Sequence, residues 1–122
     1  MNLNDATTIL ERNYNCTANS FIYELHEHSI FSKLHFWDYY DSVITLAKGT
    51  PVNERTMETA MKITVVYQHI LKEIIYHFDE NDGAHLKQFP SDYTEYITRL
   101  DDAMDAYFRN VFVKEELYFL QR

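Results

Sequence analysis

The sequence predicts an all-α fold, a single helical bundle of five to six helices around a long central helix at about residues 53–80. Two observations lead to this prediction. Only two glycines and two prolines occur in 122 residues, which leaves little room for the many turns of an all-β domain. Hydrophobic residues make up 46% of the chain, a globular composition. No linker or repeat divides the chain, so residues 1–122 are expected to form one domain.

The first two helices are expected to be short. Asn2 or Asn4 can cap a first helix that runs toward Arg12, and residues 13–15 are expected to break it. A second helix is expected to start within residues 17–20. At helical spacing, its core-facing side is predicted to consist of Phe21, Ile22, Leu25 and Ser29.

A third helix is predicted to begin after Ser32, a favourable N-cap, and to end at Lys48 and Gly49. A cation in the last turn and a glycine just beyond it are typical of a helix end. The apolar positions of this helix are Leu34, Trp37, Tyr40, Val43, Ile44 and Ala47.

The fourth helix shows the longest apolar pattern. Asn53 is its predicted cap, Glu54 lies in its first turn, and residues 81–83 are predicted to end it. Its apolar arc covers roughly half of the helix surface, more than a surface helix needs, and this predicts the central position. The arc consists of Met57, Ala60, Ile63, Val66, Tyr67, Ile70, Leu71, Ile74, Ile75 and Phe78.

A fifth helix is expected after Ser91 or Asp92, and Asp92 with Glu95 matches a capping-box pattern. Residues 111–120 leave two alternatives open. The segment 111–113 has the composition of a short strand, whereas residues 114–117 favour a final helix. The apolar positions of the fifth helix are Tyr93, Ile97, Leu100, Met104, Tyr107, Phe108 and Val111.

The chain has the features of a cytoplasmic protein. Cys16 is its single cysteine, so no disulfide can form within the chain, and a reducing compartment fits. The first ten residues are too polar for the apolar core of a signal peptide. No apolar run approaches the ~18 residues of a membrane span, and no membrane association is expected.

The formal net charge is -8 at pH 7, and most of it comes from residues 79–105. Eight carboxylates in this range are balanced only by Lys87 and Arg99. An acidic surface with tyrosines nearby suits docking onto a basic protein and suits nucleic acid poorly. The eight residues are Asp79, Glu80, Asp82, Asp92, Glu95, Asp101, Asp102 and Asp105.

Three of these carboxylates lack a local explanation. Those at residues 79–82 belong to a helix end and turn, and those at 92–95 fit a helix start. Asp101, Asp102 and Asp105 lie within a helix at spacings where like charges repel by about 0.3 kcal/mol. They form either a solvated face or a match to a cationic partner. The predicted partner-binding residues are Asp101, Asp102, Asp105, Glu95, Tyr93, Tyr96 and Asp38.

The best metal candidate is the set His69, Glu73 and His77, which steps of four residues align along the fourth helix. Histidine with carboxylate suits zinc or iron. Two turns separate the outer histidines, however, so the three side chains cannot easily converge on one ion. Hydrogen-bonded histidines at the helix edge are the favoured interpretation, and neither a metal nor another cofactor is expected.

No catalytic motif occurs in the chain. With only Gly49 and Gly83, the sequence has no glycine-rich phosphate loop, and it has neither a nucleophile elbow nor a Cys/His zinc pattern. None of the predicted helices is basic, which disfavours nucleic-acid binding. We therefore expect a binding protein and not an enzyme.

A compact, acidic, aromatic-rich helical domain without a catalytic set resembles the small immunity proteins of bacterial toxin–immunity systems. These include the partners of contact-dependent growth-inhibition toxins and of nuclease bacteriocins. The resemblance is one of overall character along the whole chain, and it assigns no residue a role through a motif. It implies an inhibitor that blocks the active site of a cognate basic toxin. The alternatives are another protein-binding inhibitor, phage-encoded or acting as an anti-activator, and a helical-bundle metalloprotein using His69, Glu73 and His77.

Overall fold

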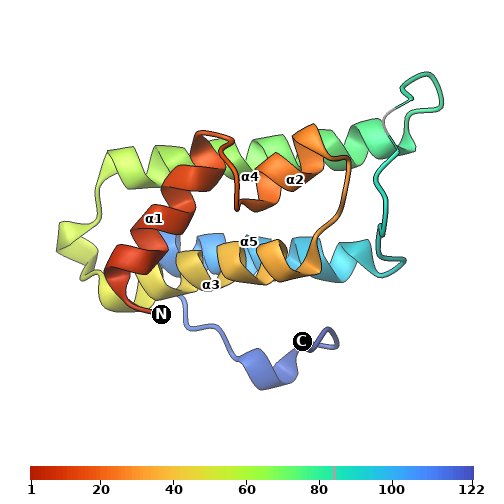
Figure 1. The fold of residues 1–122 in the computed structure, drawn as a ribbon. Helices are drawn as coiled ribbons and strands as arrows, with labels where there is room; N and C mark the ends of the chain where they lie inside the picture. Colours follow the sequence, from red (N-terminus) through yellow and green to blue (C-terminus); the bar gives the residue numbers. More distant parts are fainter. Residues whose placement is uncertain (84) are drawn as a thin grey trace.

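The computed structural model describes every residue except 84, and the described residues form an all-helical bundle (Figure 1). The predicted all-α fold is confirmed. The helices are α1 (Leu3–Tyr14), α2 (Phe21–Glu27), α3 (Lys33–Gly49), α4 (Met57–Phe78) and α5 (Tyr93–Arg109). Two single 3-10 turns, η1 (Val52–Glu54) and η2 (Glu115–Leu117), complete the described elements.

The helices form two layers (Figure 1). In one layer α3 and α5 pack against each other, and in the other α4 packs against α2, while α1 contacts α2, α3 and α4. α3 and α5 run in the same direction, so their C-terminal ends lie at the same end of the bundle. None of the described helices combines the length and the apolar character that crossing a membrane requires.

The predicted long helix is α4, which packs against α1, α2 and α5. α4 is the longest helix, but only four of its residues are buried, whereas eight residues of α3 are buried. The neighbours α1, α2 and α5 cover one side of α4, so part of its broad apolar surface faces solvent. These exposed apolar residues are Met57, Met61, Ile75 and Phe78.

Side-chain caps start four of the helices. Each cap accepts a hydrogen bond from the backbone N–H three residues later, as predicted for polar N-cap residues. The predicted cap at Asn53 is wrong, because the chain after Pro51 first closes η1 and turns extended at Arg55 before α4 begins. Asp92 precedes α5 without a side-chain cap bond, so the predicted capping box with Glu95 does not form. The four caps are Asn2, Ser20, Ser32 and Thr56.

Asn13, predicted to begin a break, is instead a buried residue of α1. Its side-chain amide donates to the Ile9 carbonyl at 2.9 Å, and its oxygen accepts the Ile22 N–H at 3.1 Å. One buried side chain therefore fixes the start of α2 against the end of α1. Ser29, predicted to lie on the inner face of α2, falls beyond the end of that helix at a φ of 53°.

Residues 110–122, which we call the C-terminal segment, form neither the predicted helix nor a strand. After α5 the chain is irregular until the single turn η2. Asn110 ends α5 in the left-handed conformation, with a φ of 57°. This conformation turns the chain back, and the segment then runs along α3 (Figure 1).

Candidate functional site

The mid-helix carboxylates of α5 point in different directions. Asp101 accepts a hydrogen bond from the Tyr67 hydroxyl of α4. Asp102 accepts one of 2.5 Å from the Tyr118 hydroxyl of the C-terminal segment. Burial raises the pKa of both hydroxyls, and the hydrogen bonds to the carboxylates raise it further, so both tyrosines remain proton donors. Two of the three carboxylates therefore tie α5 to its neighbours.

The third carboxylate, Asp105, makes a looser contact. Its Oδ1 atom lies 3.6 Å from Nε of Arg109, one turn later on the same exposed surface. Such exposed pairs contribute about 0.3–0.5 kcal/mol, so Asp105 can exchange this partner at little cost. Of the other predicted acids, Glu95 is half-buried on α5 and Asp38 is exposed on α3.

The predicted tyrosine anchors lie inward. Tyr96 is only 4% exposed, and its ring packs edge-on against Phe31 and Phe36 at centroid distances of 5.1 and 4.7 Å. It is a core residue and not a surface contact, contrary to the prediction. Tyr93 is half-buried and packs against Phe78 and Phe89 at the N-terminal end of α5.

A buried arginine holds the C-terminal segment against the bundle. Arg99 is 1% exposed, and its guanidinium bonds the Glu115 carboxylate and the Leu120 carbonyl, the latter at 2.5 Å. It also donates to the Tyr40 hydroxyl at 3.2 Å and lies 4.0 Å from the centroid of the Tyr118 ring. The ion pair, the hydrogen bonds and the aromatic contact together offset the free-energy cost of burying this charge.

In the sequence, Arg99 counts only as one of two cations in residues 79–105, although its helical spacing also indicates burial. Arg99 shares the helix face of Tyr96, Leu100 and Ala103, all of which are buried. An arginine within an apolar face is rarely buried without a partner. The identity of that partner could not be predicted, because Glu115 belongs to a segment without helical periodicity.

The C-terminal segment and α5 enclose a groove of about 310 Å³, which we call the acidic groove. Two of the predicted carboxylates meet at it, while the segment supplies exposed apolar side chains. Phe112 is 75% exposed and Leu117 72% exposed. Sequence reasoning missed both anchors, since their exposure depends on the irregular path of the segment. The groove is lined by Asp102, Asp105, Val111, Phe112, Val113, Lys114, Leu117 and Tyr118.

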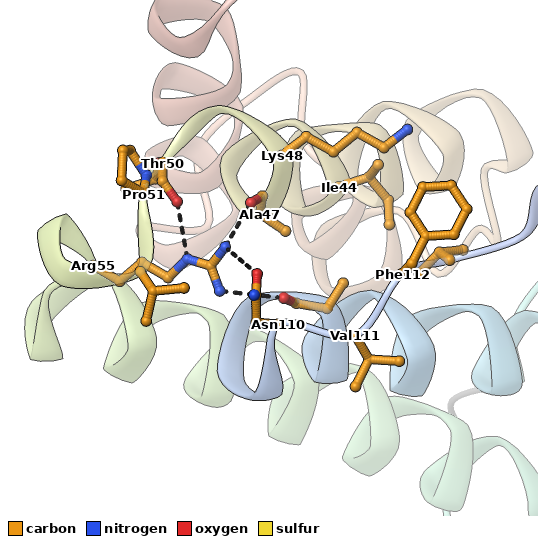
Figure 2. A pocket seen from close by; sticks show the side chains of 12 residues that line it. Ile44, Ala47, Lys48, Thr50, Pro51, Arg55, Asn110, Val111 and Phe112 are labelled. Carbon is orange, nitrogen blue, oxygen red and sulfur yellow. Dashed lines mark hydrogen bonds between the residues drawn. The ribbon is translucent and has the colours of Figure 1, made fainter.

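A second hollow, of about 360 Å³, lies between the C-terminal ends of α3 and α5 and shares residues 111–113 with the acidic groove. Figure 2 shows Arg55 pointing into the gap between the two helix ends, with Val111 and Phe112 on the other side. Phe112 therefore borders both hollows.

The five guanidinium N–H groups of Arg55 are matched by five acceptors. Carbonyl oxygens of Thr50, Ala47, Ala106 and Tyr107 and the Asn110 side chain accept at 2.6–3.3 Å. Three of these carbonyls belong to the last turns of α3 and α5, where a cation is favourable. Arg55 is therefore a structural clamp with no donor left for an anionic ligand.

The metal candidates do not converge. Glu73 pairs with His26 of α2 at 3.1 Å, and His77 accepts the Leu86 N–H at its Nδ1 atom, at 2.8 Å. Within the described part of the chain, no group of three or more His, Cys, Asp or Glu side chains is arranged to hold a metal ion. Of the two candidate histidines, His77 makes the hydrogen bond that the favoured interpretation expected, whereas His69 lies exposed on α4.

No family model matches the chain, and comparisons with curated proteins and with solved structures find no match either.

Proposed function

We propose that the chain is an immunity-type inhibitor that binds a basic protein toxin and occludes its active site, without catalysis or a cofactor of its own. The proposal includes action in the cytoplasm. The acidic groove is the observation that supports it most, because exposed apolar anchors and carboxylates meet there on one surface. This surface replaces the tyrosine-rich face expected from the sequence.

The two kinds of residue in the groove suit two parts of a protein interface. Phe112 and Leu117 are large, exposed and held by a segment that Arg99 fixes to the bundle, so little ordering is required on binding. A few fully desolvated side chains near the centre of an interface supply most of its affinity. Asp105 lies beside them with only an exposed intrahelical partner, which suits a rim charge that steers a basic partner.

The net charge of -8 favours the same class of partner. It accelerates encounter with a cationic protein and repels nucleic acid. Carboxylates at the groove resemble substrate phosphates in charge, so they fit the cationic cleft of a nuclease. The second candidate, another protein-binding inhibitor, would use the same groove, and the activity of the partner distinguishes the two.

The test begins with co-purification of the partner from the source cell at low salt, followed by binding measurements on the purified pair. We expect a basic partner, and we expect F112A/L117A to weaken binding by about 30-fold or more. D105K should mainly lower the association rate constant, and that rate constant should then depend less on the salt concentration. The matched controls are Leu34→Ala, an exposed apolar residue of α3, and Glu80→Lys, an exposed acid after α4; both should leave the affinity within about twofold.

Expression of the captured partner alone should arrest growth, and co-expression of the wild type, but not of F112A/L117A, should restore it. Restoration by both proteins, or wild-type affinity of F112A/L117A, would refute the groove as the docking surface. A basic partner that binds at the groove but has no toxic activity would favour the second candidate.

A further inference from the structure

Arg122 of the C-terminal segment lies on α3 in an arrangement typical of arginine recognition. Its two terminal nitrogens each bond one oxygen of the Asp41 carboxylate, both at 2.6 Å. The guanidinium carbon lies 4.7 Å from the centroid of the Trp37 ring and 5.8 Å from that of Tyr40. We call Asp41, Trp37 and Tyr40 the guanidinium site.

The site selects for shape as well as for charge. A planar guanidinium can bond both carboxylate oxygens while it stacks on an aromatic ring, whereas an ammonium group can do only one of these well. Tryptophan provides the most favourable ring face for a cation. The chemistry of the site therefore fits an arginine side chain better than a lysine side chain.

Contacts that do not involve Arg122 also hold the guanidinium site in place. Trp37, Tyr40 and Asp41 follow one another on α3, and the Tyr40 hydroxyl is fixed by a 2.7 Å hydrogen bond to Glu115. Arg99 also lies 5.2 Å from the Trp37 centroid. Removal of the Arg122 side chain would leave these contacts in place.

Arg122 itself is accessible to a competing group. The side chains of Asp41 and Arg122 are 34% and 47% exposed, so water and a second guanidinium can reach both partners. Asp41 raises the pKa of Arg122, and Glu115 adds to this effect. Burial opposes this rise in the pKa of Arg122. The exposed Asp38 lies one turn before Asp41.

We propose that the guanidinium site binds an arginine side chain of a basic protein partner, and that Arg122 occupies it in the free protein. The partner's arginine displaces Arg122 and takes over both carboxylate oxygens and the ring face. The source of this arginine rests on the proposed function, whereas the existence of the site does not.

The site can be tested without the partner, because Trp37 is the single tryptophan of the chain and reports on its own ring. N-acetyl-arginine amide is titrated into wild type and R122Q at constant ionic strength, and the tryptophan emission is recorded. We expect a saturable response whose midpoint is about fivefold lower for R122Q than for wild type. N-acetyl-lysine amide should bind R122Q more weakly than the arginine probe.

Two variants control the titration. R122Q/D41N should lose the response to the arginine probe. R109Q removes another exposed arginine, paired with Asp105, and should titrate like wild type. The chemical shift of the Trp37 indole N–H gives a second measurement if any emission change is small.

Equal midpoints for wild type and R122Q, or equal binding of the arginine and lysine probes, would overturn the inference. That result would leave the docking role of Phe112 and Leu117 untouched. Conversely, the proposed docking surface would be refuted if binding of the co-purified partner did not depend on Phe112 and Leu117. The probe titration would still decide whether the guanidinium site exists.

Discussion

Arg99 lies on the buried side of α5, between core residues, and its charge has to be compensated inside the protein. A buried guanidinium costs several kcal/mol unless an anion and hydrogen-bond acceptors surround it. Glu115 supplies the anion and Leu120 a carbonyl. The attachment of the C-terminal segment thus depends on one charge and not on apolar contact alone.

Glu115→Gln would leave Arg99 buried without its anion, and we expect it to lower the free energy of unfolding by about 3 kcal/mol. Arg99→Met should cost less, because it removes the buried charge and keeps most of the side-chain volume. Urea denaturation monitored by circular dichroism measures both losses of unfolding free energy, provided that the variants keep the m-value of the wild type. A larger loss for R99M than for E115Q would contradict a stabilising role for charge compensation.

The contacts of individual side chains were the hardest features to predict from the sequence. The spacing of α5 placed Arg99 on the apolar face, but its partners come from an irregular segment. Likewise, the sequence predicts repulsion of Asp101 and Asp102 by Asp105 but no partner for them. Their tyrosine partners, on α4 and in the C-terminal segment, could not be predicted, because the contacts depend on tertiary packing and not on local periodicity.

At the scale of elements, the helices followed from apolar spacing, whereas some boundaries depended on competing local structure. The predicted start of α4 at Asn53 was plausible by residue type, yet Pro51 directs the chain into η1 first. The hydroxyl of Thr56 then accepts the Thr59 N–H at 3.2 Å. Thr56, and not Asn53, is therefore the residue whose side chain starts α4.

Thr56→Ala should lower the free energy of unfolding by about 1 kcal/mol, because it leaves an N–H of the first turn without an acceptor. Asn53→Ala serves as the matched control and should change it by less than about 0.5 kcal/mol. Thermal and urea denaturation of the two variants measure the difference. An equal effect of both substitutions would argue against the helix start at Met57.

The end of α4 is joined to the following loop by a histidine that must stay neutral. His77 accepts the Leu86 N–H at its Nδ1 atom, which requires an unprotonated nitrogen. Burial lowers the pKa of His77 from its ordinary 6.5, and His85 lowers it further. The unfolded chain therefore binds this proton more readily than the folded chain. The stability that depends on neutral His77 is complete above pH 6.5 and is lost as the pH falls through the folded-state pKa.

His77→Asn preserves an acceptor for Leu86 but removes the titration. We expect the urea midpoint of wild type to fall more steeply below pH 6.5 than that of H77N, and the two proteins to run parallel above it. The histidines that do not interact with His77 are common to both proteins and cancel in the comparison. Parallel profiles over the whole range would show that protonation of His77 is not coupled to folding.

At the scale of the whole molecule, composition was the most informative property of the sequence. Few glycines and prolines predicted an all-helical bundle, and the structure confirms it. The apolar width of α4 did not predict how much of the helix is buried, since part of a broad apolar arc can face solvent. The acidic balance was evident from the sequence, but only the path of the C-terminal segment places apolar anchors beside Asp102 and Asp105.

The clamp formed by Arg55 bears on how long the folded state lasts. Its acceptors include the last turns of two helices, and one of them, Ala106, lies 51 residues further along the chain. These bonds can form only after both helix ends have met, and we expect them to arise after the rate-limiting step of folding. Interactions absent from that step slow unfolding and leave the folding rate unchanged. We therefore expect Arg55 to act chiefly on the lifetime of the native protein.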